Sequence, residues 1–219
     1  MKRALNEYQT LVFDCDGVVL NSNHVKTNAF YNATLPYGEE AATAFVKYHT
    51  ENGGISRYKK FAHFLKAIAP KVEGPCLEEL LEHYAEEVVE GLLTCDVAPG
   101  LEKLREQVPN SRWLIASGGD QDELRRVFDG RDLAPLFDGG IFGSPTPKKE
   151  ILDRELENQN IQKSALFLGD SKYDYASAQH AGLDFVFLSG WSEVKGWQEW
   201  VNTNGIKHSD SLTDLREVS

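Results

Sequence analysis

The sequence has few cysteines, little positive charge and no long apolar run. Its three cysteines are an odd set without zinc-ligand spacing, which favours a reducing cytoplasm over secretion. Only 23 Lys and Arg stand against 34 Asp and Glu, a net charge of −11, so nucleic acid and anionic membranes are not expected partners. No apolar run approaches the roughly 18–20 residues that span a bilayer, and none follows the basic start as a signal peptide requires. We therefore expect a cytoplasmic protein.

Short apolar segments do alternate with helical patterns along most of the chain. Five continuous hydrophobic runs, typical of strands covered on both faces, occur at residues 11–13, 112–116, 140–142, 165–168 and 184–188. Helical patterns follow at residues 120–128, 148–158 and 174–181. This alternation predicts an α/β fold with a parallel sheet and right-handed crossovers. The 219 residues suit one such domain that carries a sizeable insertion.

The stretch between the first and second predicted strands breaks the alternation. It has helical patterns, punctuated by proline and glycine, at residues 24–35, 39–51, 56–68 and 77–93. A segment of about 75 residues is far longer than an ordinary loop of about 2–6 residues. We expect residues 20–96 to form an all-helical cap domain inserted into a core domain of residues 1–19 and 97–219.

Polar side chains follow the predicted strands at the points where the strands end. They are Asp14, Asp16, Ser117 with Gly118, Lys148, Asp170 and Asp174. Ligands of open parallel sheets bind beyond the carboxyl ends of the strands, so these groups should converge. Carboxylates suit Mg²⁺, whereas a hydroxyl, backbone amides and an ammonium suit phosphoryl oxygens. One carboxylate can accept a phosphoryl group while a second moves the proton of the leaving alcohol. The pattern predicts phosphoryl transfer.

Each of these features alone also has a purely structural interpretation. Two aspartates after a strand are often turn residues, and Ser117 could cap a helix. Asp170 and Asp174 could be a loop residue and a helix start that the helix dipole favours, and a lysine pair could be solvated. All four features in order, each at the end of a strand, are hard to obtain by accident, which favours the functional interpretation.

The four segments resemble the motifs of the haloacid dehalogenase-like (HAD) hydrolase superfamily. The first motif is matched by Leu11-Val-Phe-Asp14-Cys-Asp16-Gly-Val, and the second by Ile115-Ala-Ser117-Gly. The third is matched by Lys148, and the fourth by Leu168-Gly-Asp170-Ser-Lys-Tyr-Asp174. The inserted helices stand where the family has its helical type 1 cap, so the resemblance covers nearly the whole chain. It implies a doubly wound, Rossmann-like core.

The resemblance also implies a role for each matched residue. Asp14 would be the nucleophile and Asp16 the general acid and base. Asp14, the Asp16 carbonyl and Asp170 would hold Mg²⁺, with Asp174 supporting or joining them. The phosphoryl oxygens would be bound by Ser117 and Gly118, and Lys148 would bridge Asp14 and the phosphoryl group.

Two segments depart from the family pattern. The family often places its lysine before a proline, whereas here Pro147 precedes the pair Lys148 and Lys149. Either lysine could be the motif residue, and we take Lys148. The segment Leu20-Asn-Ser-Asn23 stands where many relatives show Asp-Ser-Glu, which affects the expected cap hinge rather than the chemistry.

A basic segment, residues 53–60, lies within the predicted cap. Two glycines precede Arg57, Lys59 and Lys60 in an otherwise acidic chain. One hypothesis is a specificity loop in which Arg57 contacts an anionic or hydroxyl-rich leaving group. The alternative is one solvated face of a helix.

The function that the sequence predicts is Mg²⁺-dependent hydrolysis of a small phosphorylated metabolite, such as a sugar phosphate, through an aspartyl phosphate on Asp14. By the resemblance, Asp16 disfavours dehalogenases and phosphonate hydrolases, which lack an acid/base aspartate there. A β-phosphoglucomutase-like mutase shares both aspartates and the helical cap, and it stays as an alternative. A phosphate-sensing or receiver-type binding module is a third, but receivers are single domains with short connections. The substrate and the oligomeric state are not indicated.

Overall fold

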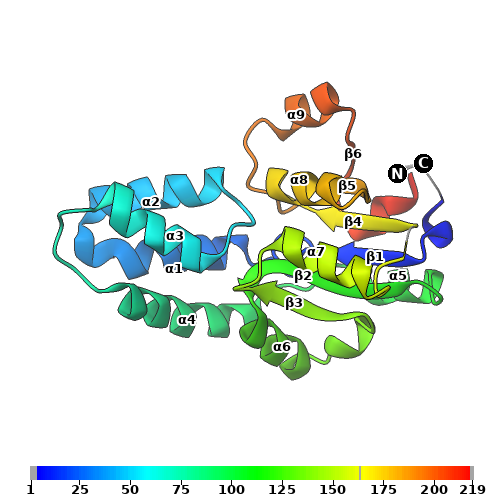
Figure 1. The fold of residues 1–219 in the computed structure, drawn as a ribbon, viewed down its shortest axis with the longest axis horizontal. Helices are drawn as coiled ribbons and strands as arrows, with labels where there is room; N and C mark the ends of the chain where they lie inside the picture. The colour runs from blue at the N-terminus through cyan, green and yellow to red at the C-terminus, as the bar shows by residue number, and fades with distance from the viewer. Residues whose placement is uncertain (1–3, 163, 218–219) are drawn as a thin grey trace.

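Six parallel strands form one sheet in a computed structural model that describes residues 4–162 and 164–217 (Figure 1). The strands are β1 (Thr10–Phe13), β2 (Arg112–Asp120), β3 (Gly140–Ser144), β4 (Ala165–Gly169), β5 (Asp184–Leu188) and β6 (Lys207–Ser209). Their order, β3-β2-β1-β4-β5-β6, is the doubly wound arrangement that was predicted. Strands β2 and β3 are added on one side of β1, and β4, β5 and β6 on the other, so β1 pairs in parallel with both β2 and β4.

Helices cover both faces of the sheet, which explains why the strands are continuously apolar. Leu11 and Phe13 of β1 pack in the same core as α5 (Leu101–Gln107) and α6 (Gln121–Gly130). Val12 points the other way, into a core shared with α7 (Lys148–Glu157), α8 (Lys172–His180) and α9 (Trp197–Asn204). Because successive side chains of a strand face opposite sides, a strand between two cores needs an apolar residue at every position.

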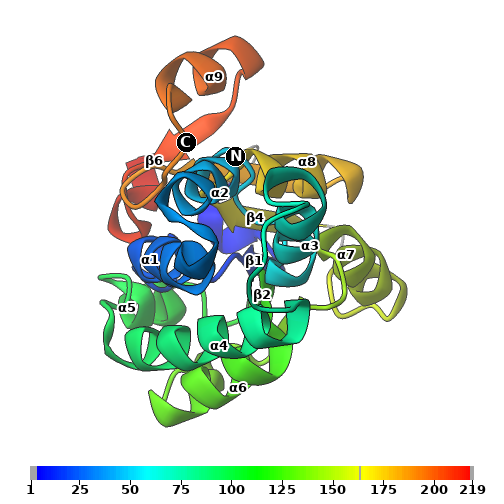
Figure 2. The same ribbon diagram turned by 90° about the vertical axis from the view of Figure 1, so that its left-hand side faces the viewer.

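Four helices form a separate cap region beyond one end of the sheet (Figure 1). They are α1 (Asn23–Thr34), α2 (Glu39–Glu51), α3 (Arg57–His63), which continues as a π-helical turn (Phe64–Ile68), and α4 (Leu77–Thr94). Their shared centre is aromatic, because the Phe30 ring lies 5.3 Å from Phe45, 5.2 Å from Phe61 and 4.3 Å from Tyr84, centroid to centroid. Seen from the cap side, α1, α2 and α3 lie in front of the central strands (Figure 2).

Some elements differ from the sequence prediction. Strand β2 continues through Asp120, so Ser117 lies within a strand rather than in a loop. The short strand β6 was not predicted, because its residues Lys207 and His208 are exposed and polar. At the C-terminal end, Trp197 and Trp200 of α9 both pack against the Phe187 ring of β5. Within the described part of the chain, no helix combines the length and apolar character that crossing a bilayer requires.

Candidate active site

The two neighbouring strands β1 and β4 bring the first and fourth motifs together. Phe13, at the end of β1, pairs with Leu168 of β4, so Asp14 and Asp170 leave the sheet side by side. Asp174 lies in the first turn of α8, where its Oδ2 accepts a hydrogen bond from the Ser171 hydroxyl at 2.6 Å. Residues distant in the sequence therefore meet beyond the carboxyl ends of the strands, as predicted.

Asp14, the candidate nucleophile, is buried and held by two contacts. Its Oδ2 lies 2.8 Å from Lys148 Nζ, and its Oδ1 accepts a hydrogen bond from the Cys15 N–H at 2.7 Å. Lys148 also pairs with Asp174 Oδ1. Burial, followed by the charge of Asp174, raises the pKa of Asp14 to about 7, although Lys148 acts in the opposite direction. Lys149 is partly exposed, so the structure brings Lys148 rather than Lys149 to the candidate nucleophile.

Three buried carboxylates form a group that fits a divalent cation. Asp14, Asp170 and Asp174 each offer an oxygen, and these oxygens all lie within 4.8 Å of one another. Burial, with the charges of Asp174 and Asp14, raises the pKa of Asp170 well above its usual range. Lys148 offsets part of this negative charge, and the remaining excess needs a cation or protons. Hard carboxylate oxygens are the donors that Mg²⁺ prefers, so the residues present fit this ion.

Gly17 allows the cap helix α1 to reach this carboxylate group. Its φ is +71°, and a Cβ there would lie 2.1 Å from Asp170 Oδ2. The space is used by Asn23 of α1, whose Nδ2 donates a hydrogen bond to Asp170 Oδ2 at 2.9 Å. Asn23 belongs to the segment that departs from the family pattern. This departure was the one signal in the sequence that could have identified Asn23 as a residue of the site.

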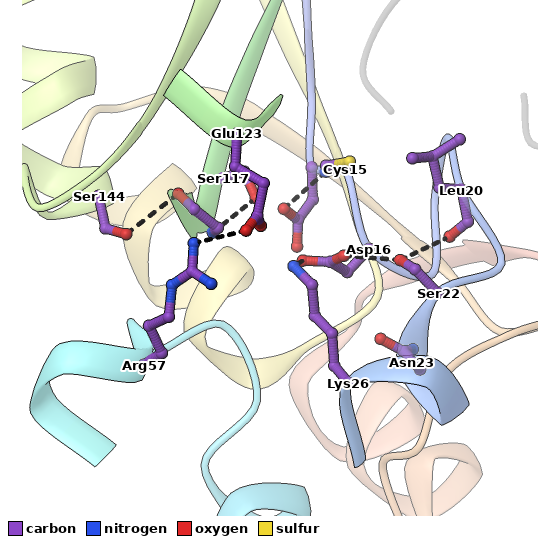
Figure 3. Close-up of polar contacts among 12 residues, drawn as sticks. Cys15, Asp16, Leu20, Ser22, Asn23, Lys26, Arg57, Ser117, Glu123 and Ser144 are labelled. Atoms are coloured by element: carbon purple, nitrogen blue, oxygen red, sulfur yellow. Dashed lines mark hydrogen bonds and ion pairs between the residues drawn. The ribbon is translucent and has the colours of Figure 1, made fainter. Parts of the chain in front are cut away.

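Asp16 is the candidate general acid and base. Within residues 4–162 and 164–217, its side chain makes no hydrogen bond or ion pair with Asp14, Asp170 or Asp174. Its Oδ2 lies 2.6 Å from Lys26 Nζ, and its Oδ1 accepts a hydrogen bond from the Ser22 hydroxyl at 2.6 Å (Figure 3). Burial alone would raise the pKa of Asp16, but Lys26 and Ser22 together lower it below its usual value. Lys26 could not be predicted as a site residue, because it is a single lysine on a cap helix with no motif around it.

The end of β2 supplies a hydroxyl and closely packed backbone. The buried Ser117 hydroxyl accepts a hydrogen bond from the Gly119 N–H at 3.0 Å. Gly118 lies directly under the cap, because a Cβ there would be 2.3 Å from the carbonyl oxygen of Gly54. The glycine pair of the cap therefore packs on the end of β2 that was expected to bind phosphoryl oxygens.

The basic segment of the cap is not a solvated helix face. Arg57 is only 7% exposed, and its Nη2 lies 2.9 Å from Glu123 Oε2 in the first turn of α6 (Figure 3). Tyr58 donates a hydrogen bond to Asp120 Oδ2 at 2.7 Å. The solvated-face interpretation is wrong for Arg57 and Lys60, which are both buried, and it holds for Lys59, which is exposed. The segment instead joins cap to core.

A small cavity of about 60 Å³ lies between the cap and the core. Asp14, Asp16, Asp170, Gly118 and Gly119 line it from the core. From the cap it is lined by polar and aromatic side chains that include Asn23, Lys26, His49, Arg57, Lys60 and Tyr84. The candidate nucleophile thus faces a partly open cavity between core and cap, to which both parts of the chain contribute charged side chains.

Comparison with known families agrees with this geometry. The model of the haloacid dehalogenase-like hydrolases matches residues 8–182, which includes all four motifs. The chain belongs to this family, and it is a hydrolase by that membership.

Solved structures share the fold over nearly the whole chain. A Lactobacillus plantarum protein, whose proposed activity is phosphoglycolate phosphatase, is 21% identical with a TM-score of 0.73 and covers 97% of this chain and 99% of its own. CbbY from Rhodobacter sphaeroides, solved with phosphate, is 18% identical (TM-score 0.72, 95% and 96% covered). The β-phosphoglucomutase of Clostridium difficile is 17% identical (TM-score 0.72, 93% and 91% covered). No curated protein sequence gives a significant match.

Proposed function

We propose that the protein is a Mg²⁺-dependent phosphatase that hydrolyses a small phosphorylated metabolite, such as a sugar phosphate, through a phosphoryl group carried on Asp14. The observation that carries this proposal is the buried group in which Lys148 bridges Asp14 and Asp174 beside Asp170. A carboxylate held against an ammonium, with hard oxygen ligands around it, is suited to attack phosphorus while the phosphoryl charge is neutralised. CbbY, which shares the fold, was solved with phosphate and, as a variant, with xylulose 1,5-bisphosphate.

In the first step a carboxylate oxygen of Asp14 attacks phosphorus in line with the leaving alcohol. The new bond joins this oxygen to phosphorus, the phosphorus–alkoxide bond breaks, and Asp16 delivers a proton to the alkoxide. Lys148, the Ser117 hydroxyl and the Gly118 N–H stabilise the charge on the phosphoryl oxygens. Mg²⁺, held by Asp14, Asp170 and the Asp16 carbonyl with Asp174 in support, would reduce the repulsion between nucleophile and phosphoryl group.

In the second step Asp16 acts as a base. It takes a proton from a water molecule, whose oxygen attacks phosphorus and releases inorganic phosphate, and Asp14 is regenerated. With the cap closed, the ion pair with Lys26 favours the ionised form of Asp16 that this step needs. The first step needs the protonated form, which Asp16 takes up from solvent when the cap is open and Lys26 has moved away, or keeps from the water molecule of the preceding turnover. One residue therefore serves as acid and then as base.

The cap, which we assign to residues 20–96 on a core of residues 1–19 and 97–219, controls access. A cavity of about 60 Å³ holds only a few water molecules, so a phosphomonoester enters when the cap moves away from the core. Closure then excludes bulk water and brings cap side chains to the leaving group. The acidic surface and three cysteines without a disulfide among the described residues support a cytoplasmic location.

The test is phosphate release from a broad panel of phosphorylated metabolites with Mg²⁺, for the wild type and Asp14→Asn. We expect hydrolysis by the wild type that Asp14→Asn abolishes. Inorganic phosphate equal to substrate consumed supports the phosphatase, whereas isomerised sugar phosphate without phosphate release would establish a mutase. Binding without turnover of any phosphoester would leave a phosphate-sensing module and overturn the enzyme.

A further inference from the structure

The cationic side chains that line the cavity are not equally paired. Lys26 pairs with Asp16, and Arg57 pairs with Glu123. Lys60 is 2% exposed and lines the same cavity, yet no carboxylate of the described residues lies within ion-pair distance of it. Its Nζ instead lies 2.7 Å from His49 Nδ1 and 5.4 Å from the centroid of the Phe30 ring. The cap therefore holds one buried lysine amine without a countercharge in the cavity that the candidate nucleophile also lines.

His49 presents a second donor without an acceptor. Burial and the neighbouring charge of Lys60 lower the pKa of His49 well below its usual value, so the ring is neutral. When Nδ1 accepts from the Lys60 ammonium, the ring proton lies on Nε2. His49 is 8% exposed, and Nε2 has no hydrogen-bond partner among the described residues. Burial of the His49 Nε2–H and of Lys60 without an acceptor costs free energy, unless a ligand accepts hydrogen bonds from them.

We propose that Lys60 and His49 form a second anion-binding site, so that the substrate is a phosphomonoester whose alcohol part carries a carboxylate or a further phosphate. This proposal rests on the proposed phosphatase function, and it concerns the leaving group rather than the reaction. The phosphoryl group to be cleaved binds at Asp14 and Lys148, while the second anion binds on the cap side of the same cavity.

The chemistry of the cavity favours an anion over a neutral sugar at this position. Hydroxyl groups can accept hydrogen bonds from Lys60 and His49, but they leave the ammonium charge without compensation. Burial and the like charge of Lys26 lower the pKa of Lys60 to about 7, and an anion in contact would restore the charged form. Arg57 Nη1 and Glu123 Oε1 also lack partners, and this donor and acceptor would suit a hydroxyl of the same substrate.

The experiment compares three phosphomonoesters with similar carbon chains. Glycerol 3-phosphate has a neutral leaving group, 3-phosphoglycerate adds a carboxylate, and propane-1,3-diol bisphosphate adds a second phosphate. We expect kcat/KM of the wild type to be roughly 10–100-fold higher for one or both anionic substrates than for glycerol 3-phosphate. The anionic substrate with the larger value identifies which anion the site accepts.

Two variants assign this preference to the cap. Lys60→Met keeps the length of the side chain but removes its charge, and we expect the preference to fall roughly 10-fold or more. Lys66→Met removes an exposed lysine of the same cap segment and serves as the matched control, with the preference retained. Calorimetric binding to the Asp14→Asn protein, with and without Lys60→Met, measures the same difference without turnover.

The outcomes separate this proposal from the one on which it rests. Equal kcat/KM for all three substrates, or a preference that Lys60→Met leaves intact, overturns the second anion site while phosphatase activity stands. Failure to hydrolyse any phosphomonoester overturns the proposed function itself. If Lys60→Met fails to fold, the comparison of substrates in the wild type still decides, because it needs no cap variant.

Discussion

Lys26 Nζ lies 2.6 Å from Asp16 Oδ2, so a cap helix places its charge directly on the candidate general acid and base of the core. The two side chains are 10% and 17% exposed, and the Ser22 hydroxyl donates a further hydrogen bond to Asp16 Oδ1 at 2.6 Å. Because Lys26 lies on α1 and Asp16 follows β1, movement of the cap would separate the pair. In the proposed mechanism, cap closure and proton transfer by Asp16 would therefore be linked.

Replacement of Asp16 by asparagine tests its role as an acid. For an alkyl phosphate, whose leaving group needs a proton, we expect kcat/KM of Asp16→Asn to fall about 10²–10⁴-fold. For p-nitrophenyl phosphate, whose leaving group departs as a stable anion, the loss in kcat/KM should be smaller, because its first step does not need Asp16 as an acid. Steady-state kcat/KM for both substrates measures the difference, since it excludes the second step that the two substrates share. Equal losses would show that Asp16 does not protonate the leaving group.

The two lysines of the third motif give a matched pair of variants. Lys148→Met removes the buried ammonium between Asp14 and Asp174, so we expect kcat to fall about 10²–10³-fold. Lys149→Met changes a partly exposed neighbour and should leave kcat nearly unaltered. Phosphate release under saturating substrate measures both. A large loss in Lys149→Met with an active Lys148→Met would reverse the assignment.

Removal of one carboxylate tests the cation site by a stability measurement. Mg²⁺ at 100 times its Kd should stabilise the wild type by about 2.7 kcal/mol, which raises Tm by roughly 5–10 °C in a chain of this size. Asp170→Asn lowers the repulsion among three buried carboxylates, so without Mg²⁺ its Tm should be at least that of the wild type. Its Tm should not respond to Mg²⁺. A full Mg²⁺ response in Asp170→Asn would place the cation elsewhere.

Lys60 gives the stability of the protein a defined pH dependence. Burial lowers the pKa of Lys60 from 10.5 to about 7, so between these values the unfolded chain binds a proton that the folded chain does not. The contribution of Lys60 to the free energy of unfolding therefore rises as the pH increases from about 7 to 10.5. Other charged groups near Lys60 are Lys26, Lys148, Asp16 and Glu193, besides the neutral His49.

The Lys60→Met variant isolates this contribution. Its advantage in unfolding free energy over the wild type should be largest below pH 7 and should shrink as pH approaches 10.5. Urea unfolding at pH 6 and pH 9.5, without substrate or Mg²⁺, measures the two differences. The same difference at both pH values would contradict the assignment to Lys60.

The ion pair between Arg57 and Glu123 joins cap to core and can be tested by a double-mutant cycle. Arg57→Met or Glu123→Gln leaves a buried partner without its countercharge, which should cost about 3–5 kcal/mol. The double variant should lose less than the sum of the two single variants, because no lone charge remains. Urea unfolding supplies all four values. Additive losses would show that the two residues act independently.

The sequence allowed prediction of the sheet and of the residues that follow its strands. Strands buried on both faces are continuously apolar, so the positions of Asp14 and Asp170 at strand ends could be inferred from pattern alone. The strand order then placed them together, because β1 and β4 are neighbours.

The contributions of the cap could not be predicted in the same way. Helical periodicity shows which residues share a face, but not which part of the core that face meets. Lys26, His49 and Asn23 reach the cavity because four helices pack around Phe30 and set their orientation over the sheet. The partner of Arg57 could not be predicted for the same reason, because Glu123 lies 66 residues away in the sequence, on a core helix.

The central claim is that Asp14 carries the phosphoryl group, and a rapid acid quench with a ³²P-labelled substrate tests it most directly. We predict that the quenched wild type holds label on the peptide containing Asp14, and that Asp14→Asn holds none. Label on a different residue, or hydrolysis by Asp14→Asn at the rate of the wild type, would contradict the account.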